Sequence, residues 1–108
     1  MMKLAEMTCN FIKKGTPPLS RTEAEALMPQ ISAWSLSEAE IKREFRFKDF
    51  HDAMNFVNKV AGVANEQDHH PDIFISYSLV RLTLSTHKIG GLSSNDFILA
   101  AKIDQLAA

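Results

Sequence analysis

The chain of 108 residues lacks several features that mark common functional classes. It has one cysteine, Cys9, so no internal disulfide can form, and this cysteine usage fits a reducing compartment. Its formal net charge is −1, without the basic excess that binds nucleic acid. No apolar run approaches the ~20 residues of a membrane helix, and the N-terminus lacks a signal-peptide apolar region. These absences predict a cytoplasmic protein that contacts neither nucleic acid nor membrane directly.

Motifs for covalent or metal-assisted catalysis are also missing. The sequence contains no Gly-x-Ser-x-Gly, and Gly90-Gly91 is typical of a turn and does not resemble a phosphate loop. Structural zinc usually requires Cys-x-x-Cys or His-x₃-His spacing, which is absent here. Asp68 could serve as a ligand, although a turn residue is an equally simple interpretation. We therefore predict neither a bound metal nor a cofactor.

The N-terminal half predicts an arm followed by alternating elements. Residues 1–20 are expected to form an irregular arm that ends in the Pro17-Pro18 segment, and residues 21–108 the folded domain. Ser20 or Thr22 can cap a short helix that ends near Pro29. Between residues 36 and 48 we expect a strand, a turn at 37–40 and a second strand, because apolar and charged residues alternate in its last part.

The C-terminal half predicts two further helices and a hairpin. After the cap Asp49, apolar residues recur with a 3.6-residue period up to residue 64, so a helix should end between residues 65 and 68. Strands are expected near 72–76 and 80–86, with a polar break at 76–78. Ser93 should cap the last helix, with Asp96 in a position like that of a capping box.

The element order indicates one α+β domain. It is α-β-β-α-β-β-α, which predicts a four-stranded antiparallel sheet with three helices packed on one face. The opposite sheet face would remain uncovered. Self-association is one way to cover it, and we expect Phe74, Leu82 and Leu84 to contribute.

Three of the four histidines lie at the two ends of the predicted hairpin. His69 and His70 precede its first strand, and His87 follows its second. Imidazole has an unperturbed pKa of about 6.5, which suits proton transfer near neutral pH. A histidine at a strand end is often only a surface residue, so clustering and simple exposure stay about equally plausible on this pattern. His51 is expected on the polar side of its helix.

The histidine segments and their surroundings resemble the pterin-4a-carbinolamine dehydratase family. The Pro17-Pro18-Leu19 segment is similar to that of bacterial and plastid-type members. The sequence departs from the family pattern at Ile12, Ile73 and Ser78-Leu79. The residues that carry the resemblance are His69-His70-Pro71, Tyr77, Val80, Leu82, Leu84, Thr86-His87, Gly91-Leu92 and Asp96, together with Trp34, Phe45, Phe47 and Phe50 upstream.

This resemblance implies an activity and a site. The enzyme would dehydrate 4a-hydroxytetrahydrobiopterin to quinonoid dihydropterin and water, and so recycle the tetrahydropterin cofactor of aromatic amino acid hydroxylases. His69, His70 and His87 would be catalytic, by metal-free acid–base chemistry. His70, Pro71 and Asp96 would bind substrate. Asp96 could instead orient a histidine, or serve only as a helix cap.

The resemblance also implies partners and alternatives. Family members form homodimers or homotetramers, and an aromatic amino acid hydroxylase is a further expected partner. One alternative is a non-catalytic dimerisation or transcriptional cofactor, or another interaction module, on the same fold. Another is a dehydratase-like protein of a different pterin pathway, such as molybdopterin metabolism.

Overall fold

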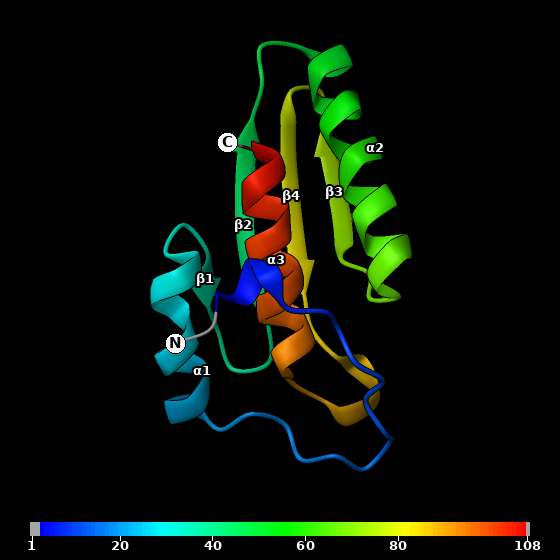
Figure 1. Cartoon of the computed structure of the whole chain (residues 1–108). Helices are drawn as coiled ribbons and strands as arrows, with labels where there is room; N and C mark the ends of the chain where they lie inside the picture. The colour runs from blue at the N-terminus through cyan, green and yellow to red at the C-terminus, as the bar shows by residue number, and fades with distance from the viewer. Residues whose placement is uncertain (1–2, 108) are drawn as a thin grey trace.

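Three helices lie on one face of a four-stranded antiparallel sheet, as predicted (Figure 1). The computed structural model describes residues 3–107. Its sheet has the strand order β1-β2-β4-β3, so the predicted hairpin supplies one central and one edge strand. In chain order the elements are η1 (Leu4–Glu6), α1 (Arg21–Leu27), η2 (Met28–Ile31), β1 (Ser35–Leu36), β2 (Ile41–Arg46), α2 (Phe50–Gln67), β3 (Asp72–Ser76), β4 (Leu79–Leu84), η3 (His87–Ile89) and α3 (Ser94–Ala107).

The helices begin where the sequence carries capping residues. The Ser20 hydroxyl accepts the Glu23 N–H, and the Glu23 carboxylate accepts the Ser20 N–H, which completes a capping box on α1. The Asp49 carboxylate accepts the Asp52 N–H at the start of α2. Helix α2 ends at Gln67, and its C-cap residue Asp68 has a left-handed backbone with φ 53°. This reversal directs the following residues back toward the sheet.

The expectation that Leu82 and Leu84 lie on the uncovered sheet face is wrong. Both side chains are fully buried on the side of the helices, because alternate residues of β4 point to opposite faces and Leu82 shares its face with the core. The open face instead carries Arg81, which donates to Glu44 and lies 4.9 Å above the Phe74 ring. Of the three candidates only Phe74 is exposed.

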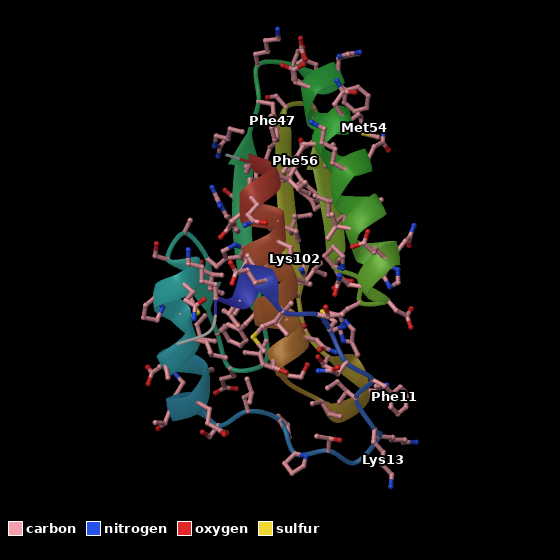
Figure 2. The ribbon with its side chains drawn as sticks, in the orientation of Figure 1. Phe11, Lys13, Phe47, Met54, Phe56 and Lys102 are labelled. Carbon is pink, nitrogen blue, oxygen red and sulfur yellow. The ribbon has the colours of Figure 1, made fainter. Side chains whose placement is uncertain are left out.

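The N-terminal arm packs on α3 and on the segment that precedes it. Leu4 of η1 is buried, and the Lys102 ammonium of α3 donates to the Ala5 carbonyl (Figure 2). Further along, the Leu19 N–H donates to the Leu92 carbonyl. A Cβ at Gly91 would lie 2.8 Å from the Cβ of Pro18, so the backbone at residue 91 touches the arm directly. Beyond η1 the described part of the arm has no helix or strand, and both of its ends are tied to the rest of the fold.

Within residues 3–107, no helix combines the length and the apolar character needed to cross a bilayer.

Candidate active site

The two histidine segments lie at the same end of the sheet. Strands β3 and β4 are antiparallel, with Asp72 opposite Thr83, so the residues before β3 and those after β4 meet at one end of the sheet. His69 and His70 belong to the first segment, between α2 and β3, and His87 opens η3 in the second. Helix α3 begins close to this end of the sheet and supplies an acidic partner, Asp96.

The central interaction of this region joins His69 to Asp96. His69 Nε2 lies 2.6 Å from Asp96 Oδ1, although the two residues are 27 positions apart in sequence. The Asp96 side chain is completely buried, and that of His69 is only 12% exposed. A short contact between a histidine and a carboxylate in such a dry setting is a charge-assisted hydrogen bond. It fixes the orientation of the imidazole in the segment that connects α2 to β3.

Asp96 is itself held by the segment between β4 and α3. Its Oδ2 accepts the Thr86 hydroxyl at 2.8 Å and the Ser93 N–H at 2.9 Å. Thr86 has one hydroxyl proton, which it donates to the carboxylate, so the Ser93 hydroxyl must be the donor in the 2.7 Å contact between Thr86 and Ser93. With both oxygens engaged in the first turn of α3, Asp96 caps the helix and also orients His69.

This arrangement determines the tautomer of His69. A carboxylate only accepts, so the proton of the neutral imidazole is on Nε2 and the lone pair is on Nδ1. Among the described residues Nδ1 has no hydrogen-bond partner, so it can accept a proton from a bound molecule and return it. The carboxylate then compensates the positive charge that the imidazole acquires.

The other histidines have different partners. His70 is exposed, and its Nε2 lies 2.9 Å from the side-chain oxygen of Asn65 in α2. His87 is 77% exposed, and its Nε2 lies 3.9 Å from Asp72 Oδ2. Pro71 is half-buried between these positions. No hydrogen bond joins two imidazoles within the described chain, so convergence of the three on one concave site stays a prediction.

Nucleophilic catalysis by Cys9 and metal binding both depend on the surroundings of the side chains concerned. Burial raises the pKa of the Cys9 thiol to about 11, while the nearby Lys102 lowers it and Asp96 raises it, so the thiol is a poor nucleophile at neutral pH. Among residues 3–107, no three His, Cys, Asp or Glu side chains are grouped as a metal site. His51 lies on the exposed surface of α2, as expected.

Several residues of this region were missed by the sequence analysis. Ser93 and Thr86 both form hydrogen bonds with Asp96. From the sequence, Ser93 was expected only as a helix cap, and Thr86 only as part of the family motif. Gln67 and Asn95 bind the arm: Gln67 Oε1 accepts the Cys9 N–H, and Asn95 exchanges two hydrogen bonds with the Asn10 backbone. Their partners lie 58 and 85 residues away, and no local pattern indicates such pairs.

Comparison with known proteins points to one family. The sequence profile described as pterin 4 alpha carbinolamine dehydratase matches residues 17–106. A protein of Halorhodospira halophila, provisionally named as pterin-4-alpha-carbinolamine dehydratase, is 47% identical over 109 residues, covering 99% of this chain and all of its own length.

Two solved structures have the same architecture. The crystal structure of a transcriptional coactivator/pterin dehydratase from Brucella melitensis matches with a TM-score of 0.80 and 32% identity, over 84% of this chain and 99% of that one. A pterin dehydratase-like protein described as a RuBisCO assembly factor in the alpha-carboxysome matches with a TM-score of 0.58 over 69% of this chain and 87% of that one; at 21% identity it supports the fold alone.

Proposed function

Because the chain belongs to the pterin-4a-carbinolamine dehydratase family, we propose that it converts 4a-hydroxytetrahydrobiopterin into quinonoid dihydropterin and water. In this role it would recycle the tetrahydropterin cofactor of aromatic amino acid hydroxylases. The observation that carries the proposal is the 2.6 Å contact between His69 Nε2 and the fully buried Asp96.

The reaction requires two proton transfers and no electron transfer. The C4a–O bond breaks, the hydroxyl leaves as water after it gains a proton, and a ring N–H loses its proton as the C=N bond forms. One donor and one acceptor with pKa values near neutrality can supply both steps, and each group typically contributes about 10²–10⁴-fold in rate. Imidazoles are the side chains best suited to this pair of steps.

His69 is the group whose surroundings best fit proton transfer. Its Nδ1 is free to take a proton from the substrate while Asp96 balances the charge that results. Because the Asp96 carboxylate is fully buried and bonded through both oxygens, we assign it a positioning role in place of direct substrate contact. Thr86 and Ser93 then act through Asp96.

We assign the second proton-transfer role to His87 and a binding role to His70. His87 is exposed beside Asp72, which can orient its ring when a ligand approaches. His70 is held by Asn65, and it is suited to a hydrogen bond with the polar ring atoms of a pterin. Pro71 fixes the backbone between these positions and would contribute to substrate contact. The proposal requires neither metal nor cofactor, since the pterin is the substrate.

The direct test is a stopped assay of 4a-hydroxytetrahydropterin dehydration with the purified full chain. Dehydration also proceeds slowly without catalyst, so the background rate is measured and subtracted. We expect a rate well above background that is unchanged by a chelator. A rate equal to background would overturn the proposed function, and inactivation by the chelator would overturn the metal-free mechanism.

A second candidate function is an interaction module on the same fold. The name of the Brucella melitensis protein combines transcriptional coactivator with pterin dehydratase, which keeps this candidate open. A pure interaction module has no need for a buried carboxylate aimed at an imidazole. Wild-type dehydration that disappears in the histidine variants would favour the enzyme. A dehydratase-like protein of another pterin pathway, such as molybdopterin metabolism, would instead prefer a different pterin as substrate.

We also propose that the chain assembles as a homodimer or homotetramer, and that an aromatic amino acid hydroxylase is its partner in recycling. The open sheet face is a suitable contact surface, because it carries Phe74, which is half exposed, among charged side chains. Light scattering at micromolar concentration should give a mass at least twice 12.1 kDa. A monomer mass at that concentration would contradict the assembly.

A further inference from the structure

The N-terminal arm contacts residues that lie next to three site residues in the sequence: His69, Asp96 and His87. The Cys9 N–H donates to Gln67, two residues before His69, at 2.8 Å. The Asn95 side chain, one residue before Asp96, accepts the Asn10 N–H at 2.9 Å and donates to the Asn10 carbonyl at 2.6 Å. The next arm residue, Phe11, contacts Lys88, the residue after His87.

Phe11 is an exposed aromatic side chain held in a defined place. Phe11 lies on the N-terminal arm (Figure 2) and is 84% exposed. The Lys88 ammonium lies 4.3 Å from the ring centroid. A cation over one face leaves the other face accessible, and the paired hydrogen bonds at Asn10 fix the backbone from which the ring projects. The free face of such a ring can stack on the flat ring of a ligand.

On the arm side, these contacts come from residues that the family profile does not include. The family profile matches residues 17–106, so Cys9, Asn10 and Phe11 lie outside it. The Halorhodospira halophila protein nevertheless covers 99% of this chain, including nearly all of the arm. The arm is thus a feature that some relatives share and that the profile does not require.

We infer that Phe11 forms an aromatic wall of the dehydratase site and that Asn95 is the positioning residue that holds it there. This inference rests on the proposed function, and it assigns Phe11 to the recognition of a flat heteroaromatic ring by stacking. The groups that transfer protons are not involved. Loss of Phe11 should therefore raise KM and leave kcat nearly unchanged, because a uniform loss of binding affects both ground and transition states.

The variants separate stacking from size. Phe11→Leu keeps an apolar side chain of similar bulk but removes the flat ring, and Phe11→Tyr restores it. We expect Phe11→Leu to raise KM roughly tenfold, with kcat within about a factor of two, and Phe11→Tyr to remain close to wild type. Lys14→Ala, an exposed arm variant, is the matched control and should change neither parameter.

Asn95→Ala tests the positioning role. It removes both hydrogen bonds to the Asn10 backbone, so it should raise KM by a similar factor even though it leaves Phe11 in the chain. The thermal midpoint of each variant identifies a general loss of folding. Unchanged KM values for Phe11→Leu would overturn the role of the ring, and an unchanged KM for Asn95→Ala would overturn the positioning role.

A binding measurement distinguishes failure of this inference from failure of the proposed function. Fluorescence titration with 7,8-dihydrobiopterin, a stable pterin, needs no turnover. Wild type could lack dehydration activity yet bind this pterin, with binding roughly tenfold weaker in Phe11→Leu. That result would support the role of Phe11 in pterin binding and overturn only the proposed activity. If wild type dehydrates its substrate and Phe11→Leu binds and reacts normally, only the wall is wrong.

Discussion

Helix α3 carries two aspartates that are both hydrogen-bonded across the fold but have different partners. Asp96, in the first turn, is completely buried and faces His69. Asp104, near the end of the helix, is 25% exposed, and its Oδ1 accepts from Trp34 Nε1 at 2.8 Å and from Arg43 Nη1 at 2.6 Å. One residue type on one helix thus serves two purposes, and the chemistry of the partner separates them.

The guanidinium of Arg43 is always charged, whereas an imidazole can gain and lose a proton. The pair of Asp104 and Arg43 is therefore a permanent tie between α3 and β2. It also offsets the unfavourable position of a carboxylate near a helix C-terminus. The pair of Asp96 and His69 can change its charge state, so it can take part in a reaction. Depth of burial alone would not have revealed this difference.

The largest expected effect comes from removing a proton-transfer group. His69→Ala and His87→Ala should each lower the enzymatic rate by roughly 10²–10⁴-fold, while His70→Ala should act mainly through KM. The measurement is background-corrected dehydration kinetics. His51→Ala is the matched control, because this histidine is 82% exposed on the surface of α2 and should leave the rate unchanged. Full activity in the His69 and His87 variants would sink the acid–base assignment.

Exchanging one carboxylate for an amide tests the comparison itself. In Asp96→Asn the side chain keeps its shape but loses its charge, and its amide can donate to His69 Nε2 and so favour the wrong tautomer. We expect kcat to fall at least tenfold. In Asp104→Asn we expect kcat within about a factor of two of wild type. Equal losses of kcat in the two variants would remove the distinction between the two aspartates.

The Asp104→Asn exchange should affect the stability of the fold although it barely affects kcat. Removing its charge leaves Arg43, which is only 25% exposed, without its ionic partner. We expect Asp104→Asn to lower the free energy of unfolding by about 1–3 kcal/mol. Urea unfolding followed by Trp34 fluorescence measures this change, because the indole itself donates to Asp104. A midpoint equal to that of wild type would mean that this tie contributes little.

The smallest expected effect concerns Cys9. Its folded pKa is about 11 against an ordinary 9.0, so at pH 8 the native chain has roughly a hundredfold less thiolate than a free thiol. Alkylation by iodoacetamide should be correspondingly slower in the native protein than in urea. Because the unfolded thiol ionises first, the stability of the wild type should decline between pH 9 and 11 relative to Cys9→Ala. Equal alkylation rates would contradict this.

Local signals in the sequence predicted much of the fold. Ser20 and Asp49 cap helices at the expected residues, and the polar break at 76–78 is the turn of the hairpin, where Tyr77 has a positive φ. The error at Leu82 and Leu84 arose because alternation reveals that a strand has two faces, but it does not identify the face that the helices cover. That choice depends on packing between distant segments.

The candidate site was predicted less completely than the fold. The sequence indicated His69, His70 and His87, and it left three roles open for Asp96: substrate binding, orientation of a histidine and a helix cap. The geometry combines the last two, and substrate binding stays a prediction. The arm contacts at Gln67 and Asn95 were not predicted. They depend on pairs more than fifty residues apart, which only the folded chain brings together.

The close approach of Gly91 to Pro18 has a consequence for the history of related sequences. Gly91 does not adopt a left-handed backbone, so space for the arm is what requires a residue without a side chain at this position. A lineage that lost the arm would lose that requirement as well. Across related sequences, glycine at position 91 and an arm ending in proline should therefore be inherited together. A relative that retained only one of them would be a recent departure or an exception to the shared constraint.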